Sequence, residues 1–187
     1  MMKALRNLKS IVTALAIILP GITQAQDSAG DLDALFAELR AAETAQDAAR
    51  TARRIERIWG KSGSASVDLL LERGRDAMEE GDTAAAVEHF SAATDHAPGW
   101  AHGYTLRAEA FFMAERFGPA LEDIAVALAA EPRDFRALTL FGAIMLHLDE
   151  MAHARDAFAR LATIHPLSDD LSTLQEQVDL ATGELEL

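Results

Sequence analysis

Three prolines, Pro98, Pro132 and Pro166, stand 34 residues apart, and the stretches that precede them align without a gap. A fixed period of this length is typical of helix pairs that stack in an array, because one pair cannot bury its apolar face alone and shares a core with its neighbours. The period predicts three units, at residues 67–100, 101–134 and 135–168. The sequence therefore favours an elongated, all-helical array.

Large and small residues recur at fixed places in these units. The eighth place holds Gly74, Ala108 and Gly142, the twentieth holds Ala86, Ala120 and Ala154, and the twenty-fourth holds Phe90, Ile124 and Phe158. Small residues let two helices approach closely, while large ones fill the space beside them. Turn signals at Gly81-Asp82, Phe117-Gly118-Pro119 and Asp149-Glu150 predict the breaks between paired helices.

This register of small, aromatic and proline places resembles the tetratricopeptide repeat family over residues 67–168. The resemblance implies an all-α, right-handed α-solenoid of three helix-turn-helix repeats. The seventh place departs from the family pattern, with Arg73 and Arg107 where an aliphatic residue is common. An arginine stem can lie along the edge of the core with its charged head in water, so the departure is compatible with the fold.

The segments on either side of the units are also predicted to be helical. Residues 169–187 form a capping helix and tail, with an apolar stripe at Leu171, Leu174 and Val178. Residues 26–66 form a helical pair followed by a Gly/Ser-rich connection. This pair is either a cap on the stack, derived from a degraded repeat, or a tethered arm. The need to bury Phe36 and Trp59 favours the cap.

The first 25 residues have the pattern of an export signal. Lys3, Arg6 and Lys9 precede an apolar run at residues 11–19, and Thr23-Gln24-Ala25 fits a cleavage site. The run is too short for an ordinary membrane-spanning helix, which needs about 20 apolar residues. The form of the signal predicts a periplasmic protein of a bacterium. The alternative is a protein anchored in the inner membrane by an uncleaved signal.

Charge excludes several classes of partner. The whole chain has a formal net charge of −13, which becomes −16 when residues 1–25, with three basic residues and no acid, are removed. Such a chain repels the phosphate backbone of nucleic acids and anionic lipid, so neither nucleic acid nor membrane association is predicted after cleavage.

The resemblance implies that the first helix of each unit lines a concave groove that binds a partner. The residues at the lining places are Asp68, Leu71, Arg75, Met78, Glu79, His102, Thr105, Glu109, Phe112, Met113, Arg136, Thr139, Leu146 and His147. Met78, Phe112 and Leu146 form an apolar row, with Arg75 and Arg136 as charged anchors, which suits a peptide segment or helix. The paired Lys and Asn of the family members that grip a C-terminal carboxylate are missing here.

A basic stripe stands apart from these repeats. Arg50, Arg53, Arg54 and Arg57 are spaced as one face of a helix, and residues 169–186 carry six acids and no base. The stripe is either a solvated helix face or a docking surface. If the two ends attract each other between copies, the protein is a self-assembling structural element of the cell envelope and a homo-oligomer.

The sequence contains no recognisable catalytic motif. There is no cysteine, no pair of histidines at i, i+4, no Gly-rich phosphate loop and no G-x-S-x-G turn. We therefore expect no metal, no cofactor and no enzymatic activity. The sequence predicts an exported scaffold or adaptor that binds a segment of another protein, with self-assembly as the alternative.

Overall fold

The computed structural model of the chain describes residues 21–182, with side chains from residue 31 onward, and this part contains nine helices and no strand. The helices are α1 (Gly21–Arg40), α2 (Ala45–Trp59), α3 (Ala65–Glu79), α4 (Thr83–His96), α5 (Ala101–Met113), α6 (Phe117–Ala130), α7 (Phe135–His147), α8 (Met151–Ile164) and α9 (Asp169–Thr182). The predicted all-α class is confirmed.

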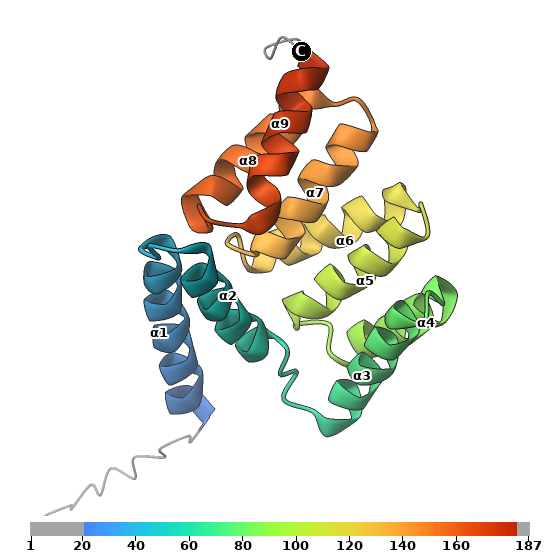
Figure 1. Cartoon of the computed structure of the whole chain (residues 1–187). Helices are drawn as coiled ribbons and strands as arrows, with labels where there is room; N and C mark the ends of the chain where they lie inside the picture. The colour runs from blue at the N-terminus through green and yellow to red at the C-terminus, as the bar shows by residue number, and fades with distance from the viewer. Residues whose placement is uncertain (1–20, 183–187) are drawn as a thin grey trace, which may run out of the picture.

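Three antiparallel helix pairs, α3–α4, α5–α6 and α7–α8, follow one another in an arc (Figure 1). Each pair also contacts the next, through α4 with α5 and α6 with α7. Helix α9 packs on α8 and α7, and it buries Leu171 and Val178 against them. The molecule is thus an α-solenoid whose last pair is covered by a single helix, as the apolar stripe of that helix predicts.

A steric match between the eighth and twenty-fourth places holds each pair together. A Cβ atom added to Gly74 would clash with the ring of Phe90, and one added to Gly142 would clash with the ring of Phe158. The middle pair has Ala108 at the eighth place, and there the facing residue is the smaller Ile124. The size of one residue therefore compensates for the size of the other at the closest approach of the two helices.

The fifteenth place of each unit adopts a left-handed backbone conformation. The φ angles are 77° at Gly81, 56° at Glu115 and 63° at Asp149. This geometry ends the first helix of each pair, and the following amide N–H reaches back to the helix, as from Arg116 to the carbonyl of Phe111 at 2.8 Å. The turn predicted at residues 117–119 was therefore misplaced. It lies at residues 114–116, because Gly118 and Pro119 fit within the first turn of α6.

The N-terminal pair α1–α2 does not extend the stack as a cap. It turns back, so that α1 packs against α8 and α2 lies along the inner side of the arc (Figure 1). Arg133, in the connection from α6 to α7, binds Asp33 at 2.6 Å and lies 4.2 Å over the ring of Phe36. The cap prediction was wrong, because the apolar side chains of this pair find their partners at the other end of the chain.

Two apolar clusters result from this arrangement. One joins α1 and α2 to residues of α5–α9, and the other is centred on α3 and α4. The outer side of α3 carries Leu69, which is 47% exposed. The predicted signal peptide, residues 1–25, lies largely outside the described residues and stays a prediction. Among helices the structure describes, none has the length and apolar character needed to cross a bilayer.

Candidate partner-binding groove

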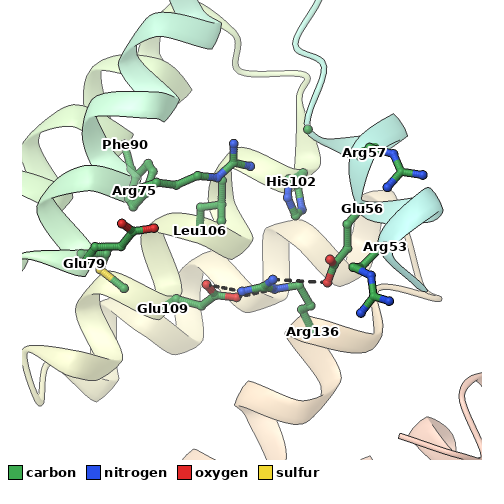
Figure 2. Close-up of a pocket in the computed structure, with 12 residues that line it drawn as sticks. Arg53, Glu56, Arg57, Arg75, Glu79, Phe90, His102, Leu106, Glu109 and Arg136 are labelled. Carbon is green, nitrogen blue, oxygen red and sulfur yellow. Dashed lines mark hydrogen bonds and ion pairs between the residues drawn. The ribbon is translucent and has the colours of Figure 1, made fainter. Parts of the chain in front are cut away.

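Helix α2 forms one wall of a groove whose other wall is made by the first helices α3, α5 and α7 (Figure 2). Arg136 of α7 connects the walls. Its guanidinium donates two hydrogen bonds to Glu109 of α5, both at 2.8 Å, and a third to Glu56 of α2 at 3.3 Å. This ion-pair bridge, defined as Arg136 with Glu109 and Glu56, spans the groove near its middle.

An aromatic cluster fixes the C-terminal end of α2 to the repeats. The ring of Trp59 lies 5.1 Å from that of Phe135 and 5.9 Å from those of Phe36 and His102. The indole N–H of Trp100 donates to the carbonyl of Trp59 at 2.7 Å. Aromatic stacking and a directed hydrogen bond together set the position of the wall.

The bridge divides the groove into two cavities that share its three residues and Arg53. The first, here called the arginine cavity, has a volume of about 620 Å³ and lies between α2, α3 and α5. The second has a volume of about 480 Å³ and lies between α2, α7 and the start of α9, with Phe112, Leu140 and Ala143 on its walls. Asp169 and Asp170 also line the second cavity. Arginines therefore predominate in the first cavity, whereas the second has more apolar residues and two further acids.

Three arginines of the arginine cavity have no counter-ion in contact. Arg53 and Arg57 stand on α2 and Arg75 stands on α3, and none of them makes a hydrogen bond or ion pair with any residue that the structure describes. The guanidinium of Arg75 reaches toward Gly60, where an added Cβ would lie 3.5 Å from it. Glu79 is the one acid of this cavity outside the bridge.

Burial shifts the protonation of the groups beneath the groove. The pKa of His102 falls to about 3, first because the ring is buried and then because Arg136 and Arg75 repel a proton, so the ring is neutral. Its Nδ1 atom has no hydrogen-bond partner among the described residues. Burial raises the pKa of Glu109, against the opposing effect of Arg136. Burial likewise raises the pKa of Asp134, which caps α7 and accepts a hydrogen bond from Thr105 at 2.6 Å.

The predicted groove residues divide into two groups. The eight that line the cavities are Arg75, Met78, Glu79, His102, Glu109, Phe112, Arg136 and Thr139. The six that line neither cavity are Asp68, Leu71, Thr105, Met113, Leu146 and His147. Leu71 and Thr105 are fully buried, and His102 is only 5% exposed, so a partner cannot rest on them. Arg136 is also unsuited to the role of a free anchor, since its charge is already taken by Glu109 and Glu56.

The basic stripe of α2 is split between two surroundings. Arg50 pairs with Asp47 and Arg54 pairs with Glu38, at 2.7 Å in the second case, while Arg53 faces the groove and Arg57 borders it. The groove residues were predicted from places within the repeats, and α2 lies outside the repeats. Arg53, Glu56 and Arg57 were therefore missed as groove residues. The available signal was the i, i+4 spacing of Arg53 and Arg57 on a helix with buried apolar residues on its other side.

The fold and the site define a class of protein: an α-solenoid of helix-pair repeats, with a groove along the first helix of each pair. A TPR repeat-containing protein of Rhizobium etli is 30% identical over 154 residues, which cover 82% of this chain and 74% of that protein. The chain belongs to the tetratricopeptide repeat family. No family model matches it.

Solved tetratricopeptide structures share the fold. The first TPR domain of human RPAP3 superposes with a TM-score of 0.60 at 21% identity, over 63% of this chain and 93% of that one. The Sgt2 TPR domain from Aspergillus fumigatus gives 0.61 at 20% identity, over 65% and 82%. The TPR2B domain of yeast Sti1, in complex with an Hsp70 peptide, gives 0.59 at 20% identity, over 65% and 100%.

Proposed function

We propose that this protein is an exported, non-enzymatic scaffold that binds a peptide segment or helix of another protein in the groove between α2 and the first helices of the repeats. The observation that carries the proposal is the groove itself. Two adjoining cavities, of about 620 and 480 Å³, run along one side of the arc and have both apolar and charged walls. Such mixed walls suit a peptide that places apolar anchors and charged groups alternately.

The similar structures support binding of this type. The first TPR of RPAP3 was solved with an HSP90 peptide, and the Sti1 domain was solved in complex with an Hsp70 peptide. Family members with this architecture therefore accept short segments of other proteins. We infer that this chain binds a peptide in the same way, in a groove that has α2 as one of its walls.

Export is part of the proposal. It rests on the basic start, the apolar run at residues 11–19 and the small residues before Gln26. The test is cell fractionation followed by N-terminal sequencing. A periplasmic protein that begins at Gln26 supports export, and a cytoplasmic protein that retains Met1 contradicts it.

Photo-crosslinking from inside the groove tests the binding role. A photoreactive phenylalanine analogue at Met78, which lines the arginine cavity, should form adducts with a defined peptide of another protein in living cells. The matched control places the analogue at Val126, which is 44% exposed on α6 and lines neither cavity. Circular dichroism checks that both variants are folded. Adducts with the same proteins at both positions, or with none from Met78, would exclude the groove as the binding site.

A further inference from the structure

Six of the thirteen arginines among residues 31–182 bind a carboxylate, and of the seven that bind none, three lie together in the arginine cavity. The chain has 30 acidic and 17 basic residues, and Arg50, Arg54, Arg107, Arg133, Arg136 and Arg155 each bind a carboxylate. Arg53, Arg57 and Arg75 bind none among residues 31–182, although they come from two helices and line one cavity. In a chain with so many acids, this concentration of unpaired guanidinium groups is a site of locally positive potential.

The other groups that line the cavity do not neutralise the charge of these three arginines. The bridge uses one arginine and two acids, and Glu79 is the remaining acid on the walls. His102 is neutral because of burial and of its neighbours Arg136 and Arg75, so it adds no charge. Its unpartnered Nδ1 is a further polar group at this wall that the described residues do not satisfy. The three free arginines outnumber the one free acid.

We propose that the arginine cavity binds an acidic segment of the partner protein, with Arg53, Arg57 and Arg75 pairing with side-chain carboxylates of that segment. This inference rests on the proposed function and specifies the chemistry of the partner. Guanidinium groups favour carboxylates because two parallel N–H donors match the two oxygens. The second cavity, which is lined by apolar residues and by Asp169 and Asp170, receives the rest of the segment and disfavours further acids there.

Helix α2 is essential to this site. It supplies Arg53 and Arg57, while α3 supplies Arg75. The site therefore combines a repeat with a helix that lies outside the repeats. It recognises side chains within a segment and has no requirement for the end of a chain.

Selection from a random 12-residue peptide library, displayed on phage through the peptide C-terminus, tests the inference on the purified protein. Because the displayed peptides have no free C-terminus, any carboxylates selected belong to side chains. We expect Asp and Glu to be enriched by about twofold or more, and a synthetic selected peptide to bind roughly tenfold or more weakly to Arg53→Gln/Arg57→Gln/Arg75→Gln. The affinity should also fall as salt is added.

The matched control is Arg50→Gln/Arg54→Gln/Arg160→Gln, which removes the same charge from residues that line neither groove cavity. This variant should bind the selected peptide within about twofold of the unmodified protein, since it leaves the arginine cavity unchanged. Thermal unfolding of both variants checks that they are folded. If the two triple variants lose affinity equally, general charge and not the cavity is responsible, and the inference is wrong.

The remaining outcomes separate this inference from the proposed function. If peptides are selected without enrichment of acids, and Met78→Glu abolishes their binding, the groove binds peptides but the acidic preference is wrong. If no peptide is selected, or if Met78→Glu leaves binding of every selected peptide unchanged, both proposals fail.

Discussion

The contact between Gly142 and Phe158 shows how single residues set the distance between paired helices. A Cβ at Gly142 would overlap the phenyl ring, which is fully buried and has little room to move. We expect Gly142→Ala to lower the free energy of unfolding by about 1–3 kcal/mol through overpacking. Denaturant unfolding measures the change.

A second substitution should rescue that loss. Gly142→Ala combined with Phe158→Ile reproduces the Ala108 and Ile124 combination of the middle pair. The double variant should be more stable than the sum of the two single changes predicts, by about 1 kcal/mol or more. Strictly additive effects would show that the two residues do not limit the approach of the helices.

The left-handed backbone at Glu115 lowers the free energy of unfolding, because a residue with a Cβ is strained at a φ of 56°. Gly81 occupies the same place in the first unit without strain. Glu115→Gly should therefore raise the free energy of unfolding by about 0.5–1 kcal/mol, despite the greater freedom that glycine gives to the unfolded chain. Glu115→Ala removes the same side chain without relieving the strain, and it should show no such gain in the same denaturant titration.

Buried His102 makes stability depend on pH. Its folded pKa of about 3 is below its ordinary value of 6.5, so the stability due to the neutral ring is complete above pH 6.5 and is lost as the pH falls toward 3. From about pH 7.5 to about pH 5 the loss is about 2 kcal/mol. Glu109 and Asp134, with raised pKa values, act in the opposite direction.

His102→Phe isolates this contribution. The variant should lose roughly 2 kcal/mol less than the unmodified protein over the same pH range, because the titrating group is gone while an aromatic ring still faces Trp59 and Trp100. Unfolding titrations at each pH supply the numbers. An identical pH dependence in both proteins would mean that His102 titrates normally.

At the scale of helices, α1 and α2 dock as a unit that depends on Trp59. We expect Trp59→Ala to release this unit, since the change removes its contacts with Phe135 and His102 of the repeats. Hydrogen exchange should then be faster in α1 and α2 by about tenfold or more, while α5–α8 keep their protection. Uniform loss of protection in all helices would show that α1–α2 and the repeats unfold together.

The sequence predicted the paired helices well, because their packing is local and periodic. Gly74 and Phe90, for example, recur at fixed places as Gly142 and Phe158. The position of α1–α2 could not be read in this way. It depends on contacts between residues far apart in the chain, such as Arg133 with Asp33 and Arg136 with Glu56, and these occur once and follow no period. The groove residues of α2 were missed for the same reason, whereas eight of the residues that line the groove on α3, α5 and α7 were predicted at the places that the family resemblance implies.

For the whole molecule, the return of α1–α2 leaves the outer side of α3 uncovered. The stack is covered at its last pair by α9, but Leu69 remains 47% exposed at the first pair, and the apolar cluster of α3 and α4 is separate from the larger one. In a linear array, an end that lacks a cap is stabilised by only one neighbour. We therefore expect the pair α3–α4, which carries Arg75, to open at a lower free energy than the covered last pair, and hydrogen exchange measures this difference.

The wall formed by α2 also decides which fragment of this protein retains its groove. A fragment cut at the boundaries of the 34-residue period would begin near Val67 and contain all three helix pairs. It would contain the same glycine and phenylalanine pairs, yet it would lack Arg53, Glu56, Arg57 and Trp59. Such a fragment would keep the repeats but lose the α2 wall of the groove, and with it two of the three arginines that gather in the arginine cavity.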